Sequence, residues 1–294
     1  MIKVNEVVMN YGKFQAVSGV SFEVKKGTIH GLIGENGAGK TTLIKCLVGI
    51  YKPASGQVLL EDQEIYENPK VKARMGYVAD SNKFFPSYRL GKMAEFFKDV
   101  YPNFSMEKLK ELNQIFKLDM NKRINELSKG QQMRLAFMLN IAANTEVLIM
   151  DEPTSGIDAM GKKELFSVLI KEVEERGLTV IITSHNLIEL EKICDSVTII
   201  KQGKVIENDG MDAVMGNVRK FNYAFKDGVS EEFLKHPKMV SYSNIGNVYT
   251  VIYEGITDEE LLENEKYDPV YKEELFVNLE EVFVYSNGGE AGEK

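Results

Sequence analysis

The stretch Gly34-Glu35-Asn36-Gly37-Ala38-Gly39-Lys40-Thr41-Thr42 decides the fold of this chain. It fits the spacing G-x-x-x-x-G-K-[ST] of a phosphate-binding loop. Gly34 and Gly39 leave the backbone free of Cβ atoms where it must wrap closely around phosphates, so that its N–H groups can form an anion-binding nest. Lys40 places a positive charge against the β- and γ-phosphates, and the Thr41 hydroxyl is the expected Mg²⁺ ligand. We therefore expect the whole stretch to hold the phosphates of ATP.

The flanking sequence has the order that such a loop requires. Residues 28–33 form a short apolar run typical of a buried strand, and residues 42–49 form a helical pattern that stops at Gly49. Strand, glycine loop and helix in this order favour a nucleotide site over a merely glycine-rich turn. His30 lies inside the strand, and we expect it to be a packed core side chain and not a ligand.

Composition limits the class of protein. The chain has 294 residues, of which 44% are hydrophobic, enough for one large domain or two smaller ones. No apolar run reaches the length of a transmembrane helix, and we expect no signal segment. The two cysteines, Cys46 and Cys194, lie in ordinary apolar patterns, which fits a reducing cytosol without disulfides. The net charge of -8 argues against a dedicated nucleic-acid binder, which would present a basic field.

A second part of a phosphate site follows the apolar run at residues 147–150, which ends in Asp151 and Glu152. Because every position of the run is apolar, we expect a strand covered on both faces, as in a parallel sheet. Acids at its carboxyl end lie where ligands bind in open α/β sheets. Asp151 would hold Mg²⁺ through water, and Glu152 would orient or deprotonate the attacking water. The plainer alternative is a strand that turns polar where it meets solvent.

A third part is the sequence Leu127-Ser128-Lys129-Gly130-Gln131-Gln132. Ser128 can cap the helix that follows, and Gly130 allows close backbone approach. A plain N-cap is one interpretation. The other is a further helix N-terminus that holds a γ-phosphate.

At this point the chain resembles the ATP-binding subunit of ABC transporters, since residues 127–131 are similar to the family signature LSGGQ. The resemblance implies that two such domains pair head to tail. Ser128, Gly130 and Gln131 of one subunit would then cover the ATP on the phosphate loop of the other.

Three further motifs match the family in order. Tyr11 resembles the aromatic residue that stacks on adenine, Asp158 (in Ser-Gly-Ile-Asp) resembles the D-loop at the dimer seam, and His185 resembles the switch histidine that contacts the γ-phosphate. Taken singly, Tyr11 is typical of a turn or core, and Asp158 and His185 are typical of helix caps. Their shared order over about the first 210 residues favours the nucleotide site.

The chain departs from the family pattern twice. Lys129 stands at the second signature position, usually glycine, and Asp80 stands where the Q-loop normally has glutamine. At roughly 6 Å from a phosphate charge, an ionised Asp80 would meet repulsion of roughly 3 kcal/mol at an effective dielectric near 20, and Mg²⁺ between the two would reverse that sign. Asp80 is therefore a candidate nucleotide and Mg²⁺ contact. Alternatively, Asp80, Ser81 or Asn82 caps the next helix.

We predict an α/β fold: a P-loop nucleotide triphosphatase core with an antiparallel β subdomain and a helical subdomain. This ATPase domain would span residues 1–210, with the helical subdomain at about 82–143. Helix-period spacing favours helices at residues 93–97 and 106–116, broken at 101–103. The resemblance implies that this subdomain docks on a membrane protein, and the aromatic side chains near its start are either docking or core residues, namely Phe84, Phe85 and Tyr88.

A small α+β domain is expected at residues 211–285, followed by a disordered tail at 286–294. The elements that we expect in it are a strand at 221–225, a helix from Ser230, strands at 239–243 and 247–253, and a short helix from Thr257. Residues 279–283 (Leu-Glu-Glu-Val-Phe) resemble a stretch near the C-terminus of exporter-type ATPases of antibiotic or peptide efflux.

The resemblance implies the ATPase subunit of an ABC exporter. It would use ATP and Mg²⁺, pair with a second ATPase subunit as a homodimer or heterodimer, and power a separate transmembrane permease. It would lie on the cytoplasmic face of the cell membrane. Two alternatives are a soluble ABC-type clamp acting on ribosomes or DNA, and a nucleotide-binding regulator. One phosphate loop and the absence of sustained heptads disfavour the clamp, and the presence of Glu152 and His185 disfavours the regulator.

Overall fold

The computed structural model describes residues 1–226 and 228–286. It divides into two compact units, Met1–Asn208 and Asp209–Lys294. The expected disorder of residues 286–294 falls outside the described part, apart from Ser286, which ends a helix. Within the described residues, no helix is both long and apolar enough to cross a membrane.

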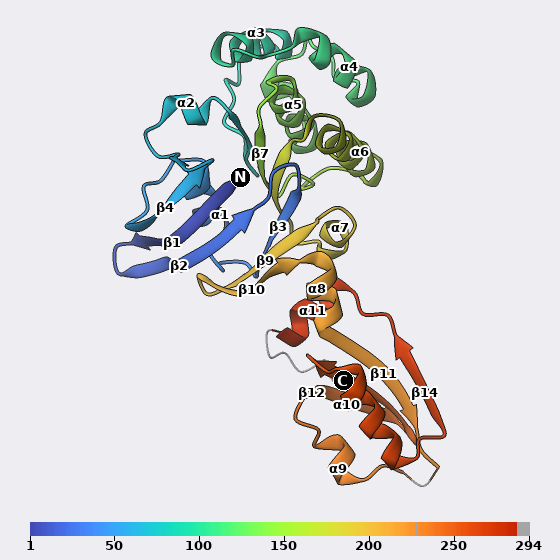
Figure 1. The fold of residues 1–294 in the computed structure, drawn as a ribbon. Helices are drawn as coiled ribbons and strands as arrows, with labels where there is room; N and C mark the ends of the chain where they lie inside the picture. Colours follow the sequence, from blue (N-terminus) through green and yellow to red (C-terminus); the bar gives the residue numbers. More distant parts are fainter. Residues whose placement is uncertain (227, 287–294) are drawn as a thin grey trace. The chain divides into compact units, whose positions relative to one another are not determined.

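The first unit is built on a mostly parallel six-stranded sheet in the order β10-β9-β3-β8-β7-β6 (Figure 1). Three central strands are buried at every residue because both faces of the sheet are covered, as their continuous apolar runs predict. Strands β9 and β10 form a hairpin, with positive φ at Gln202 and Gly203 in its turn. The strands are β3 (Ile29–Ile33), β6 (Met75–Val78), β7 (Val147–Asp151), β8 (Thr179–Thr183), β9 (Ser196–Lys201) and β10 (Lys204–Gly210).

A second, antiparallel sheet in the order β2-β1-β4-β5 belongs to the same unit. Helix α1 (Lys40–Leu47) contacts β1, β2 and β7, so it joins the two sheets through one core. That core includes Val4, Leu43 and Ile149, all buried. The strands are β1 (Ile2–Tyr11), β2 (Phe14–Val24), β4 (Ser55–Leu60) and β5 (Gln63–Glu64).

The helical part of the unit contains the two expected helices. Helix α4 matches the predicted range, with Ser105 as its N-cap, and α3 ends where Tyr101 leaves the helical conformation. Residues 82–89 precede α3 without a helix. The helices are α2 (Pro69–Lys72), α3 (Leu90–Val100), α4 (Met106–Phe116), the 3₁₀ turn η1 (Ile124–Glu126), α5 (Lys129–Ala142), α6 (Ala159–Arg176) and α7 (Leu187–Glu191).

The second unit packs a four-stranded antiparallel sheet, in the order β12-β13-β11-β14, around an aromatic core that contains Tyr223, Phe233 and Tyr253. The strands and helices expected before residue 263 are present, with Ser230 and Thr257 as N-caps. Strand β14 and helix α8 were not predicted. The elements are α8 (Met211–Asn217), β11 (Val218–Ala224), α9 (Glu231–Leu234), β12 (Met239–Ile245), β13 (Val248–Glu254), α10 (Asp258–Glu263), η2 (Asn264–Tyr267), β14 (Tyr271–Leu275) and α11 (Leu279–Ser286).

Candidate nucleotide site

Four neighbouring strands deliver the expected phosphate-site residues at one edge of the six-stranded sheet. The phosphate loop follows β3, Asp151 ends β7, His185 follows β8 and Asp80 follows β6. Because β3, β8, β7 and β6 are adjacent and parallel, their carboxyl ends lie side by side. The topology therefore gathers residues that are more than a hundred positions apart in the sequence.

The phosphate loop is held in shape by its glycines and by Lys40. Gly39 has a φ of 104°, and a Cβ there would lie 2.4 Å from the carbonyl oxygen of Ala16, so a side chain is excluded on both grounds. The Lys40 Nζ donates to the carbonyl oxygens of Gly34 at 2.6 Å and Glu35 at 3.0 Å. Burial lowers the pKa of the Lys40 ammonium, and nearby carboxylates oppose this shift. The ammonium is thus already placed inside the loop.

Asp151 is a buried carboxylate at the expected metal position. Its side chain accepts a hydrogen bond from the Thr183 hydroxyl at 2.8 Å, and the Thr41 hydroxyl opposes the rise in its pKa. Burial raises the pKa of the Asp151 carboxyl, and the neighbouring carboxylates of Glu152 and Asp80 raise it further. A bound cation would reduce the repulsion between these carboxylates and favour the ionised form of Asp151.

The donor set suits Mg²⁺ bound together with phosphates. Mg²⁺ usually takes one or two protein ligands and completes its shell with phosphate oxygens and water. In the described part of the chain, no group of three His, Cys, Asp or Glu side chains is arranged to hold a metal alone. A hydroxyl from Thr41 and a carboxylate from Asp151, beside a phosphate loop, fit this mode of binding.

Glu152 lies one residue beyond β7 in a strained conformation. Its φ is 51°, in the left-handed region that is unusual for glutamate. Its N–H donates to the Thr183 hydroxyl at 3.0 Å, and its Oε2 lies 2.7 Å from the His185 Nδ1. These contacts aim a carboxylate at the end of the strand, where a general base or water-orienting group is needed.

A cavity of about 310 Å³ opens beside the phosphate loop. Tyr11, whose hydroxyl lies 3.4 Å from the Thr42 Oγ1, and Phe14, 64% exposed, provide two aromatic side chains at this cavity. Both are available to stack on a flat ring. The lining residues are Tyr11, Phe14, Ala16, Asn36, Gly37, Gly39, Lys40, Thr41, Thr42, Asp151 and Glu152.

The N-terminus of α5 carries the signature-like residues. Ser128 and Gln131 form a reciprocal capping box, with bonds of 3.3 Å and 3.1 Å. A Cβ on Gly130 would lie 2.4 Å from the carbonyl oxygen of Gly156, so this position requires glycine. Asp158 caps α6 through the N–H of Gly161 at 2.8 Å. The capping roles considered for Ser128 and Asp158 are therefore confirmed, and they leave their phosphate and dimer roles as predictions.

Comparison with known proteins places this site in a family. Residues 17–155 match the ABC transporter family model. The ABC transporter ATP-binding protein YtrB of Bacillus subtilis is 30% identical over 289 residues, which cover 98% of this chain and 99% of YtrB. The chain belongs to the ABC transporter family. As an ABC ATP-binding protein it is an ATPase, and the similarity to YtrB extends through both units.

The chain is also similar to a second transport protein and to a solved structure. The bacitracin transport ATP-binding protein BcrA of Bacillus licheniformis is 31% identical over 224 residues, which cover 75% of this chain and 73% of BcrA. A dimeric ATP-binding cassette, MJ0796 bound to ADP and phosphate, matches with a TM-score of 0.64 at 22% identity, covering 72% of this chain and 99% of that chain. At this identity the second match shows that the ABC cassette fold is shared.

The signature-like residues do not line the cavity beside the phosphate loop of the same chain. Among the described residues that line the phosphate-loop cavity, none comes from residues 127–132 or from Asp158.

Asp80 does not cap a helix. The next helix, α3, begins at Leu90 with Arg89 as its N-cap, so the capping alternative for residues 80–82 is wrong. Asn82 instead bonds back to the N–H and carbonyl of Ala79. The Asp80 carboxylate forms an ion pair with Lys129 at 2.7 Å.

Sequence reasoning missed two residues of the site. Thr183, fully buried, connects Asp151 and Glu152 through its hydroxyl, and a polar residue ending an otherwise apolar strand was the available signal. Phe14 pairs with Tyr11 across the β1–β2 turn. The presence of a second aromatic residue shortly after Gly12 could have indicated that Phe14 belongs to the site. His30 is confirmed as a core residue: it is buried and contacts the hydroxyls of Ser196 and Thr198.

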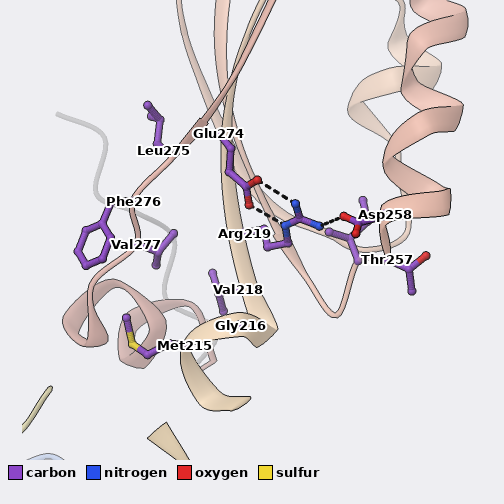
Figure 2. A pocket seen from close by; sticks show the side chains of 11 residues that line it. Met215, Gly216, Val218, Arg219, Thr257, Asp258, Glu274, Leu275, Phe276 and Val277 are labelled. Atoms are coloured by element: carbon purple, nitrogen blue, oxygen red, sulfur yellow. Dashed lines mark hydrogen bonds and ion pairs between the residues drawn. The ribbon is translucent and has the colours of Figure 1, made fainter. Parts of the chain in front are cut away.

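A larger cavity, of about 720 Å³, lies within the second unit. Figure 2 shows Arg219 at this cavity, bound by the carboxylates of Glu274 and Asp258. Because two carboxylates already neutralise this guanidinium, the cavity offers no unpaired arginine to an anionic ligand. We assign no ligand to it.

Proposed function

We propose that this ABC ATPase is the ATP-hydrolysing subunit of an exporter, and that it works as a dimer on a separate membrane permease. The observation that carries the proposal is the assembly of Lys40, Asp151, Glu152 and His185 at adjacent strand ends beside an open cavity. This arrangement suits phosphoryl transfer to water, in which the protein mainly positions groups and stabilises charge.

Each residue has a distinct part in hydrolysis. The Lys40 ammonium would leave the loop carbonyls and contact the β- and γ-phosphates. Mg²⁺ held by Thr41 and Asp151 would neutralise charge on those phosphates when bound. The Glu152 carboxylate would orient the attacking water and accept its proton, while His185 holds Glu152 and contacts the γ-phosphate.

A second subunit would close the site. The signature helix α5 presents the Ser128 hydroxyl and the backbone N–H groups at its N-terminus, which attract a γ-phosphate. In one chain these groups do not line the phosphate-loop cavity. Head-to-tail pairing would bring Ser128, Gly130 and Gln131 of one subunit to the ATP of the other, with Asp158 at the seam.

The proposed permease contact is an apolar groove of about 540 Å³ between the α2 region and the end of α3. Val100 lines it and is 53% exposed. Phe85 and Phe96 are exposed on the helical subdomain, with their ring centroids 5.5 Å apart, whereas Phe84 and Tyr88 are half-buried. We propose that a cytoplasmic helix of the permease occupies this groove, which would hold the ATPase at the inner face of the membrane.

The exporter assignment rests on two similarities. The stretch at residues 279–283 resembles the C-terminus of exporter-type ATPases and forms the start of α11. BcrA, named for bacitracin transport, is similar over 224 residues, which cover 75% of this chain. A clamp that acts on ribosomes or DNA is the competing hypothesis, and it predicts a different partner.

Co-purification distinguishes these functions. We expect the affinity-tagged protein, extracted from membranes in mild detergent, to retain an integral membrane permease. Val100→Asp together with Phe85→Asp should abolish this association, while Ile245→Asp, which charges an exposed residue of the second unit, should not. Recovery of ribosomes or DNA in place of a permease would contradict the proposal.

A further inference from the structure

The two departures from the family pattern contact each other. Asp80 and Lys129 are 49 positions apart, yet the Lys129 Nζ lies 2.7 Å from the Asp80 Oδ1. The same Nζ donates to the Ser155 Oγ at 2.9 Å. Lys129 therefore connects the loop after β6 with the segment that follows β7, from its position at the start of the signature helix.

The Lys129 side chain is fixed along its length. A Cβ on Gly156 would lie 3.6 Å from the Cβ, Cγ and Cδ atoms of Lys129, so the aliphatic stem lies against this glycine. The ammonium at its end has two oxygen partners. An exposed ion pair alone contributes little, but a stem packed on the backbone and a second hydrogen bond hold this ammonium in one place.

Asp80 lies close to the metal position without lining the nucleotide cavity. Its strand, β6, is the neighbour of β7, which ends in Asp151. Val78 of β6 pairs with Met150 of β7, so Asp80, two residues further along, leaves its strand beside the point where Asp151 ends β7. It does not line the cavity beside the phosphate loop. An ionised carboxylate at this neighbouring strand end would attract a divalent cation if it were free to turn.

We propose that Lys129 is a positioning residue that holds the Asp80 carboxylate away from the Mg²⁺ position and thereby sets the Mg²⁺ concentration that nucleotide binding requires. The inference rests on the proposed function. With Lys129 in place, Asp80 is paired and its attraction for Mg²⁺ is partly cancelled. Without Lys129, the carboxylate is free to approach the metal, and Mg²⁺ should bind at lower concentration.

Thermal unfolding at saturating ATP, recorded against Mg²⁺ concentration in the Glu152→Gln background, tests this proposal. The midpoint of the Mg²⁺-dependent rise in Tm does not need hydrolysis, and it is recorded at protein concentrations at which light scattering shows a monomer, so that dimer formation does not contribute. We expect Lys129→Met to lower this midpoint by at least about threefold when Asp80 is present, and by clearly less when Asp80→Asn is also present. Lys129→Arg keeps the charge and should leave the midpoint near that of the parent.

Lys83→Met is the matched control. Lys83 is an exposed lysine of the same loop, for which no ion pair is found among the described residues, and its removal should not move the midpoint. The inference would be overturned if Lys129→Met left the midpoint unchanged. It would also be overturned if Lys129→Met shifted the midpoint equally with and without Asp80→Asn. Either result would leave the ATPase assignment intact. If ATP failed to raise the Tm of the parent at any Mg²⁺ concentration, the proposed function would be contradicted, and this inference with it.

Discussion

The His185 Nδ1 lies 2.7 Å from the Glu152 Oε2, and the His185 backbone N–H donates to the same oxygen at 3.3 Å. Two contacts from the end of β8 thus hold a carboxylate that leaves β7 with a φ of 51°. The strained backbone directs Glu152 away from the path of the strand, and His185 fixes its carboxylate. We infer that the pair works as one unit in hydrolysis.

His185→Ala should reduce kcat by about 100-fold, because Glu152 loses its positioning contact and the γ-phosphate loses a polar partner. ATP affinity should fall much less than kcat, because Lys40 and the phosphate loop still hold the phosphates. Steady-state ATPase kinetics and a separate ATP-binding titration measure the two quantities. An increase in KM with kcat unchanged would assign His185 to binding alone.

Thr183→Val should destabilise the protein by about 1–3 kcal/mol, because the buried N–H of Glu152 and the carboxylate of Asp151 each lose a hydrogen-bond partner. Loss of the hydroxyl should also raise the pKa of Asp151 and increase the Mg²⁺ concentration needed for ATPase activity. Chemical denaturation and a Mg²⁺ titration provide the measurements. Thr183→Ser retains the hydroxyl and should stay close to wild type; equal behaviour of the two variants would contradict the assigned role.

His30 should make the protein less stable in acid. Burial lowers the pKa of His30 in the folded state to about 4, below the ordinary value of 6.5. Between these values the unfolded chain binds a proton that the folded chain does not, so stability falls as the pH drops. From pH 7 to pH 4 the loss should be about 3 kcal/mol. Unfolding titrations of wild type and His30→Gln should show this difference in slope, and parallel pH profiles would contradict it.

A chain that ends after Gly210 should still bind ATP. The residues that line the nucleotide cavity all come from the first unit, which ends at Asn208, and Gly210 completes β10. Isothermal titration should give an ATP affinity close to that of the full chain, while dimer formation or coupling to the permease is weakened. A truncated protein that is folded by circular dichroism but cannot bind ATP would show that the domain boundary is misplaced.

The buried strands and the phosphate loop could be predicted because their signals are local. Residues 147–150 are apolar without interruption, as a doubly covered strand requires, and the loop glycines occupy positions that exclude a side chain. Strand β14 could not be predicted in this way. It is an edge strand whose residues 271–274 are exposed, so it has no alternation of apolar residues.

The site could be predicted where a local sequence motif contains the functional residue, as at Lys40, Asp151 and Glu152. It was not predictable where a contact depends on tertiary structure. Nothing in the sequence around Asp80 or Lys129 indicates that these two residues form an ion pair. The contact arises because α5 packs against β6, so that the loop after β6 meets the N-terminus of α5.

Glu152→Gln provides the most direct measurement of the central claim, that two copies of this chain enclose ATP between phosphate loop and signature. Glutamine preserves the volume and hydrogen bonding but cannot accept the proton from water, so hydrolysis should fall by roughly 10²–10⁴-fold. Because ATP would then remain bound between the subunits, size-exclusion chromatography with light scattering should show an ATP-dependent dimer that wild type forms only briefly. A variant that is inactive yet stays monomeric at saturating ATP would contradict the sandwich of two identical chains.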